Sequence, residues 1–161
     1  MGSSGTIVGA GCGGEAMTLL IAKILLTLAT LGYSLGTVIA DFNRTHSTNP
    51  LWTPHARFHV VWQVLGYVGL GLLALALIWW PGPMEVERLY IVCLVSFIVF
   101  ASFYATWIAM PMYGGTNFDE NGYPPKPVTV VGKTIMLDAN FTAITVNSVL
   151  LVIAFLLILA R

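Results

Sequence analysis

The sequence has little charge for its length. Only 9% of its 161 residues are charged, whereas 57% are hydrophobic. A soluble domain usually carries about 25% charged residues, so this chain has too little polar surface to cover a globule in water. Seven basic and seven acidic residues give a formal net charge of zero, which offers no electrostatic basis for binding nucleic acid. We therefore predict a protein whose surface is covered by lipid.

Several signatures of known chemistry are also missing. The two cysteines, Cys12 and Cys93, form no CxxC motif and have no histidine at metal-ligand spacing. The chain has no glycine-rich phosphate loop and no HExxH motif. The sequence Gly-Tyr-Ser-Leu-Gly at 32–36 matches the GxSxG pattern, but it lies inside a long apolar run and not at the strand-to-helix turn that a nucleophilic serine requires. These features argue against covalent hydrolase chemistry of the usual kinds and against nucleotide binding, and we predict neither a cofactor nor a metal.

Long apolar runs are the dominant positive feature. A membrane helix needs about 20 apolar residues to cross the hydrocarbon core, and four runs reach that length, at about 16–40, 58–80, 88–109 and 135–160. We predict an all-α fold, an integral membrane four-helix bundle formed by a single domain of residues 16–161. The Gly/Ser-rich residues 1–15 are expected to be a disordered tail.

The connections between these runs are unequal in length. Residues 81–87 form a minimal link, whereas residues 41–57 and 110–134 are long and rich in polar and aromatic side chains. With four spans, the two long links lie on the same side of the membrane, and links longer than about 12 residues are usually functional. We expect the working face there, with a structured lid over residues 113–125. The basic residues, four on this side and three on the other, do not decide the membrane orientation.

Polar side chains gather in the first long link. All three histidines fall within DFNRTHSTNPLWTPHARFH, residues 41–59. On a helix that starts near Pro54, the side chains of His55, His59 and Gln63 share one face. Residues that cap a helix and contact lipid headgroups are an alternative reading of this cluster. A metal site formed by His46, His55 and His59 with an aspartate is another.

The start of the fourth run supplies a complementary set of polar residues, among them Asp138 and Asn140. The first run ends, and the second and fourth begin, at the same membrane face. We therefore expect one interfacial pocket to collect Asp41, His55, Arg57, His59, Asp138 and Asn140. Two carboxyls in different surroundings would form an acid/base pair, although hydrogen bonds between helices also explain polar residues in a membrane.

The stretch from Asp41 to His59 resembles the signature of a family of small four-span membrane proteins of fungi and bacteria. It is also similar to the small membrane hydrolases of fungal polyketide pathways of the aurovertin and citreoviridin type. Those proteins act with a flavin monooxygenase to open polyene epoxides and build oxygen heterocycles. The resemblance implies a lipophilic substrate that enters from the bilayer, contact with membrane lipid and, in a fungus, location in the endoplasmic reticulum. A homodimer is compatible with it.

This resemblance implies an epoxide hydrolase or cyclase that works by non-covalent acid/base catalysis. The residues assigned to catalysis are Asp41, Asp138, His59, Arg57 and His55. The residues assigned to substrate binding are Asn43, Arg44, His46, Gln63, Asn140, Tyr104 and Trp107. A membrane isomerase or binding protein of the sterol-isomerase type is the alternative, and a non-catalytic scaffold subunit is a second one.

Overall fold

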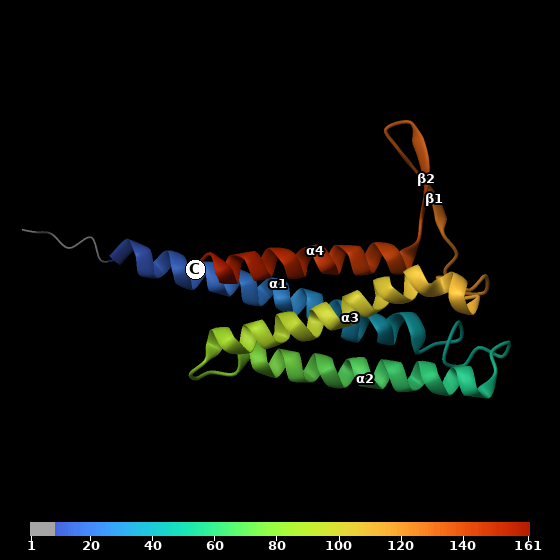
Figure 1. Ribbon diagram of the computed structural model, residues 1–161, viewed down its shortest axis with the longest axis horizontal. Coiled ribbons are helices and arrows are strands. Elements are labelled where there is room, and N and C mark those ends of the chain that lie inside the picture. The colour runs from blue at the N-terminus through green and yellow to red at the C-terminus, as the bar shows by residue number, and fades with distance from the viewer. Residues whose placement is uncertain (1–8) are drawn as a thin grey trace, which may run out of the picture.

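The computed structural model describes residues 9–161, which form four long helices and one β-hairpin (Figure 1). The helices are α1 (Gly9–Asp41), α2 (Pro54–Trp79), α3 (Glu85–Tyr113) and α4 (Ala139–Leu159), and the strands are β1 (Lys126–Val130) and β2 (Lys133–Leu137). All four helices are long and apolar enough to cross a membrane. The predicted all-α membrane bundle is confirmed, and the chain is a multi-pass membrane protein.

Two helix boundaries differ from the predicted spans. Helix α1 begins at Gly9, so the predicted tail of residues 1–15 is helical from Gly9 onward, and its residues 1–8 lie outside the described part. An established helix extends at low cost per added residue, which explains why glycine-rich sequence can join it. Helix α4 begins at Ala139 instead of near residue 135, because residues 133–137 pair with β1 in an antiparallel hairpin.

The ends of α2 and α3 follow from local chemistry. The side chain of Thr53 accepts a hydrogen bond from the backbone N–H of Ala56, and Pro54 occupies the first turn of α2, where its missing N–H costs nothing. Helix α3 continues past Pro111 and ends at Gly114, whose φ of 66° gives the left-handed C-cap that glycine adopts readily.

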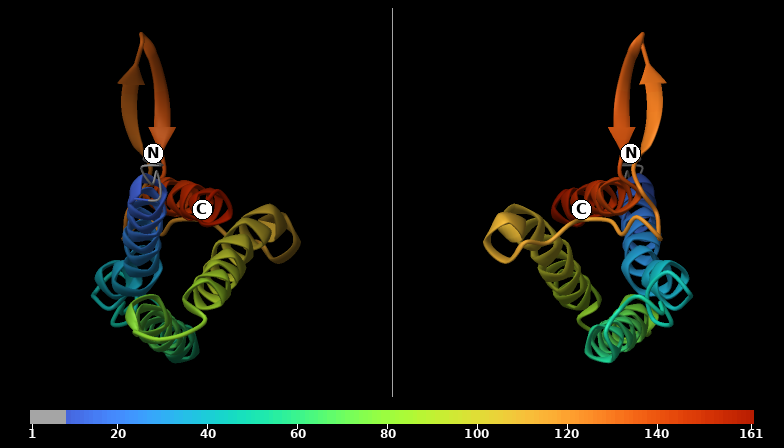
Figure 2. Two further views of the ribbon diagram at one scale, coloured as in Figure 1. Left: turned by 90° about the vertical axis from the view of Figure 1, so that its left-hand side faces the viewer. Right: turned by 90° about the vertical axis from the view of Figure 1, so that its right-hand side faces the viewer.

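Helix α1 lies between α2 and α4 and packs on both, while α3 contacts α2 and α4 and so closes the bundle (Figure 2). Glycines allow the closest approaches. Gly71 of α2 faces Ser34 of α1, and Gly32 of α1 faces Asn147 of α4. Small residues at such crossings let membrane helices approach within van der Waals contact.

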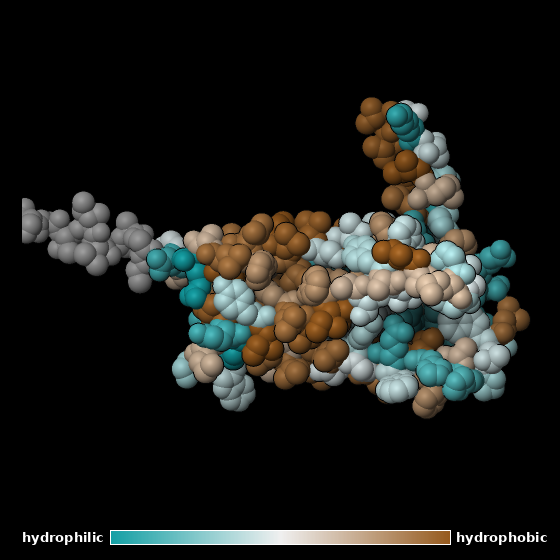
Figure 3. All heavy atoms as spheres, in the orientation of Figure 1, coloured by the Kyte–Doolittle hydropathy of each residue, from teal (hydrophilic) through white to brown (hydrophobic). Residues whose placement is uncertain are grey.

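The buried core lies toward one end of the bundle, which we call the closed end. It is built mainly from Ala22, Leu26, Ala29, Ile78, Leu89, Val92, Ala154 and Ile158. At this end Lys23 Nζ lies 2.7 Å from Glu85 Oε1, which ties α1 to the start of α3. Many large apolar side chains face outward along the bundle (Figure 3), as expected for surfaces in contact with lipid. The opposite end, which carries the two long links, is the open end.

Candidate functional site

A cavity of about 350 Å³ lies between all four helices toward the open end of the bundle. Its lining includes the carboxyl of Asp41 of α1, the amides of Gln63 of α2 and Asn140 of α4, and the hydroxyl of Tyr67 of α2. The remaining lining residues are Gly32, Tyr33, Gly36, Thr37, Ala40, Val99, Ser102, Phe103, Thr106, Ala143 and Ile144. The cavity therefore combines one charged side chain with amides, hydroxyls and apolar walls.

The sequence of α1 explains why this space exists. Gly32, Gly36 and Ala40 are spaced four residues apart, so they lie on the same face of the helix, and all three line the cavity. A Cβ atom added at Gly36 would meet only the carbonyl oxygen of Leu31, at 3.9 Å. The face of α1 that looks into the cavity thus lacks the side chains that would otherwise fill it.

A second hollow, of about 380 Å³, lies between α3 and α4. Its lining consists of Tyr90, Cys93, Leu94, Phe97, Leu151, Val152 and Phe155. This lining contains no carboxylate, amide or basic group that could transfer a proton or orient a polar substrate. We therefore place the candidate site in the cavity that contains Asp41.

Asp41 is held at the mouth of this cavity as the last residue of α1. Its side chain is 21% exposed, and its Oδ1 atom lies 3.8 Å from Nδ1 of His46 in the first long link. The carboxylate is therefore largely withdrawn from water, with one imidazole beside it. In the cavity it is accompanied by the hydroxyl-bearing side chains of Tyr67, Ser102 and Thr106.

The Asn43 side chain fixes the chain that leaves α1. Its amide nitrogen donates to the carbonyl oxygens of Ile39 and Ala40, each at 2.9 Å, which satisfies two carbonyls at the end of the helix. Its amide oxygen accepts from the backbone N–H of Thr45 at 2.8 Å and from the Thr45 hydroxyl at 2.6 Å. The side-chain amide of Asn43 thus makes four hydrogen bonds that shape the link.

The same network fixes which ring nitrogen of His46 carries hydrogen. The hydroxyl hydrogen of Thr45 is given to Asn43, so Thr45 Oγ1 must accept from Nδ1 of His46, 2.8 Å away. In neutral His46 the hydrogen is therefore on Nδ1, the nitrogen nearer to Asp41. The hydrogen bond to Thr45 orients the ring, and the Asp41 carboxylate, 3.8 Å from the same nitrogen, lies beyond hydrogen-bond range.

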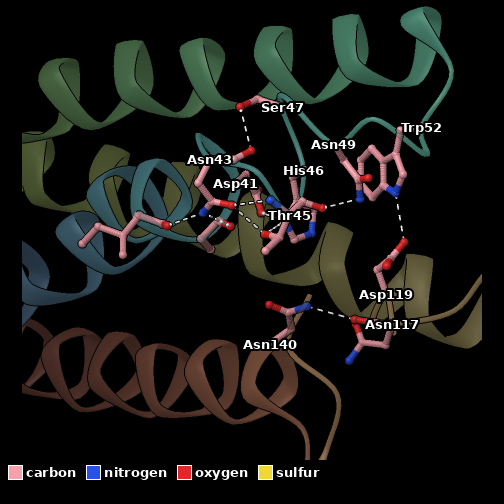
Figure 4. Close-up of polar contacts among 12 residues, drawn as sticks. Asp41, Asn43, Thr45, His46, Ser47, Asn49, Trp52, Asn117, Asp119 and Asn140 are labelled. Carbon is pink, nitrogen blue, oxygen red and sulfur yellow. Dashed lines mark hydrogen bonds and ion pairs between the residues drawn. The ribbon is translucent and has the colours of Figure 1, made fainter. Parts of the chain in front are cut away.

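Side-chain contacts join the two long links beside the cavity (Figure 4). Trp52 Nε1 donates to Asp119 Oδ2 at 2.9 Å, and the ring of His46 meets that of Trp52 edge-on at 5.1 Å. Asn140 Nδ2 donates to the carbonyl oxygen of Asn117 at 2.9 Å. The hydrogen bond from Trp52, followed by that from the backbone of Asn121, lowers the pKa of Asp119, so this carboxyl is ionised at neutral pH.

Asp138, predicted as the second catalytic carboxyl, is the N-cap of α4 and is not among the residues that line the cavity. Its Oδ1 accepts from the backbone N–H of Phe141 at 2.8 Å. The predicted position depended on a helix that began near residue 135. Because strand β2 runs to Leu137, Asp138 instead stands at the first turn of α4, where an aspartate caps the helix.

His55 and His59 lie on the outside of α2, where both are exposed. Their Nε2 atoms are 3.0 Å apart, and His59 stacks against Trp62. They share a face as predicted, but that face does not line the cavity, although Gln63 does. Within residues 9–161 no group of three or more His, Cys, Asp or Glu side chains could hold a metal ion, so the alternative histidine metal site is not formed there.

The other predicted residues also lie outside the cavity lining. Arg57 is half-buried on the first turn of α2, and Arg44 is exposed in the first link. The Tyr104 hydroxyl lies 3.2 Å from Thr145 Oγ1, which joins α3 to α4. The ring of Trp107 packs on Phe141. Of the predicted set, the structure brings Asp41, Gln63 and Asn140 together in one cavity.

Sequence reasoning missed Tyr67, Ser102 and Thr106, which line the cavity with Asp41. A signal for them was present. Tyr67 follows Gln63 by four residues and Thr106 follows Ser102 by four, so each pair marks a polar stripe on an otherwise apolar membrane helix. The glycines at positions 32 and 36 gave the matching signal on α1.

Comparison with known proteins gives a family but no activity. Residues 25–147, which are more than half of the chain, match the profile of a family described as "Family of unknown function (DUF6640)". The matched region includes the first long link and parts of all four helices. No curated protein and no solved structure matches the chain.

Proposed function

We propose that this chain, which belongs to the DUF6640 family, is a membrane-embedded enzyme that opens epoxides of lipophilic polyenes or polyketides. The observation that carries the proposal is the position of Asp41. It is the charged residue of a cavity of about 350 Å³ between helices long enough to cross a membrane. Polar and ionisable groups at membrane depth are costly and mark functional sites. The resemblance of residues 41–59 to membrane epoxide hydrolases supplies the reaction type.

In the proposed reaction the Asp41 carboxylate removes a proton from water, or from a hydroxyl of the substrate, as that oxygen attacks an epoxide carbon. The bond between this carbon and the epoxide oxygen breaks. The Tyr67 hydroxyl gives its proton to the departing oxygen, and the protonated Asp41 then returns a proton to the tyrosine. The balance is one epoxide and one water to one diol, or one epoxide and one internal hydroxyl to a cyclic ether. General acid/base help of this kind is typically worth about 10²–10⁴-fold in rate.

This assignment differs from a mechanism with two carboxyls. Asp138 caps α4, so the proton donor is assigned to Tyr67, which lines the same cavity as Asp41. Gln63 and the free amide oxygen of Asn140 would orient the substrate. His46 lies beside Asp41 but is not among the lining residues, so we assign it to positioning the carboxylate.

A lipophilic substrate dissolved in the bilayer would reach the cavity between helices, which gives a reason for an enzyme of this kind to be embedded. Its substrate must come from an oxidising step that places oxygen across a double bond. A flavin monooxygenase fits that role, as it does in the pathways whose membrane hydrolases the first link resembles. A fungal source would place both proteins at the endoplasmic reticulum.

The test uses two conservative variants of the protein in lipid nanodiscs. A monoepoxide of a linear polyene is added in ¹⁸O-labelled water, and products are identified by mass spectrometry. Asp41→Asn should lower turnover by about 10²–10⁴-fold. Asp138→Asn is the matched control, because asparagine caps helices about as well as aspartate, and it should retain activity. Equal loss in both variants would favour two carboxyls, and full activity of Asp41→Asn would end the assignment.

The site also favours one rival. A single carboxylate facing a hydroxyl in an apolar cavity can remove a proton from one carbon and return it to another, as an isomerase of the sterol type requires. Isomerisation needs no epoxide and adds no oxygen, so conversion of an epoxide-free sterol to a double-bond isomer of unchanged mass would select it. If Asp41→Asn changes only folding or assembly, and no product forms from either substrate class, a scaffold role would be favoured instead.

A further inference from the structure

The hairpin of β1 and β2 stands apart from the rest of the chain. It leaves the bundle sideways, across the direction of the helices (Figure 1). Every one of its strand residues is exposed. An isolated two-stranded hairpin is marginally stable in water. A hairpin with this shape therefore needs a partner that the described chain does not supply.

The side chains of the hairpin are unusually apolar for such exposure. Pairing of Val128 with Ile135 and of Lys126 with Leu137 sets the register. Alternate residues of a strand point to opposite faces, so one face carries Val128, Val130, Ile135 and Leu137, with Lys126 and Lys133 at its two ends. The opposite face carries Pro127, Met136 and the threonine pair, whose hydroxyl oxygens lie 3.3 Å apart.

The tip of the hairpin also exposes an apolar side chain. Val131 is 98% exposed and has a φ of 48°, followed by Gly132 with a φ of 74°. Two positive φ values form the type of two-residue turn that favours asparagine or aspartate followed by glycine. A β-branched residue is strained there. The chain thus places an exposed apolar side chain where a polar one would fit the backbone better.

The length of α4 locates the hairpin relative to the bilayer. Its 21 residues span about 32 Å at 1.5 Å per residue, close to the hydrocarbon thickness of about 30 Å. The start of α4 therefore coincides with the edge of the hydrocarbon. The hairpin ends at Leu137, one residue before the N-cap Asp138, so its base lies at this edge. Its apolar side chains gather on the side turned toward the closed end of the bundle, and more polar ones on the side turned toward the links (Figure 3).

We infer that the hairpin lies in the headgroup region of the bilayer and docks on lipid with its apolar side chains directed toward the hydrocarbon. The interface still supplies water for the unpaired backbone groups at the strand edges, which the hydrocarbon core could not do. Lys126 and Lys133, at the base and near the tip, can extend their ammonium groups to the headgroups. The occupant of this surface is therefore the lipid interface of the chain's own membrane.

A second copy of the chain is the competing occupant. Addition of a strand from another copy would use the free edge of β1 or β2. Pro127 removes a donor from β1, and lysines stand at both ends of the hairpin, which are devices that discourage edge pairing. These features favour lipid over another strand.

Spin labels can distinguish the two occupants. In a background with Cys12→Ser and Cys93→Ser, a nitroxide is attached in either the Ile135→Cys or the Thr129→Cys variant, and the protein is placed in phosphatidylcholine nanodiscs that hold one chain each. We expect relaxation by oxygen, which concentrates in lipid, to exceed relaxation by a water-soluble nickel complex at position 135. The order should reverse at position 129, which is the matched control on the opposite face.

Greater accessibility to nickel than to oxygen at both positions would overturn the inference. Protection of position 135 that appears only in nanodiscs holding two chains would also overturn it, in favour of the second copy. Circular dichroism of each labelled variant checks that the helices are retained. Neither position lies in the proposed catalytic cavity, so this result is independent of the proposed function.

Discussion

Filling the cavity from α1 should abolish its function without destabilising the fold. Gly36 lines the cavity, and a Cβ atom at this position has no neighbour closer than 3.9 Å. Gly36→Leu adds four carbon groups. If each takes roughly the 30 Å³ share of a water molecule, the new side chain fills roughly 120 Å³. That is about a third of a cavity of about 350 Å³.

The free energy of unfolding should stay the same or rise in this variant. Glycine inside a helix costs about 0.5–1 kcal/mol relative to alanine, and leucine is nearly as good a helix former as alanine. Turnover of a lipophilic epoxide should fall by about 10²-fold or more, as expected when the acid/base groups can no longer reach the substrate. Thermal unfolding in nanodiscs and ¹⁸O incorporation measure the two quantities.

A second readout does not depend on the substrate. In the Cys12→Ser, Cys93→Ser background, a cysteine introduced by Thr37→Cys lines the cavity and should react with a small methanethiosulfonate reagent. Adding Gly36→Leu should slow this reaction. Gly66→Leu is the control, because Gly66 on α2 is exposed and has open space around it. Marked destabilisation by Gly36→Leu, or unchanged labelling and turnover, would refute the picture of an open and functional cavity.

Two further predictions concern packing and pH. Gly71→Ala should destabilise the protein by about 1–3 kcal/mol, the usual cost of overpacking, because its Cβ would lie 2.5 Å from Cβ of Ser34. Gly69→Ala is the control and should not destabilise the protein, because Gly69 has open space around it. Equal unfolding midpoints of the two variants would contradict the close helix crossing. The hydrogen bond from Trp52 lowers the pKa of Asp119, so the contact between the links contributes stability above the ordinary aspartate pKa of about 3.9 and loses it as the pH falls through the lower folded pKa. The indole N–H resonance of Trp52 should therefore hold its position down to about pH 3.9 and shift below it, whereas in Asp119→Asn this titration should be absent.

The sequence predicted the elements whose signal is local. The four membrane helices followed from apolar runs long enough to cross a bilayer, and the start of α2 followed from Thr53 and Pro54, which satisfy its first turn. The open end was also predictable, because the number of spans puts both long links on one side. Of the six residues expected in one pocket, Asp41 and Asn140 line the cavity, and Gln63, predicted as a substrate-binding residue, lines it with them.

The rotation of each helix and the pairing of segments far apart in the chain could not be predicted from the sequence in the same way. An apolar run does not reveal whether residues 133–137 begin a helix or form a strand, because apolar side chains are common in both. What decides between them is the pairing of these residues with β1. That choice moved Asp138 from inside a helix to its cap. His55 and His59 are exposed on α2 away from the cavity, whereas Gln63, also exposed, and the half-buried Tyr67 lie on the side of α2 that lines it.

Composition and run length determine by themselves that this chain crosses a membrane four times, because the transfer of apolar side chains into lipid depends on each segment alone. Which polar groups share a space depends on how four helices rotate and approach one another, and that is set by contacts such as Ser34 with Gly71 and Trp52 with Asp119. Those contacts join residues far apart in the chain, so the cavity around Asp41 exists only in the folded bundle.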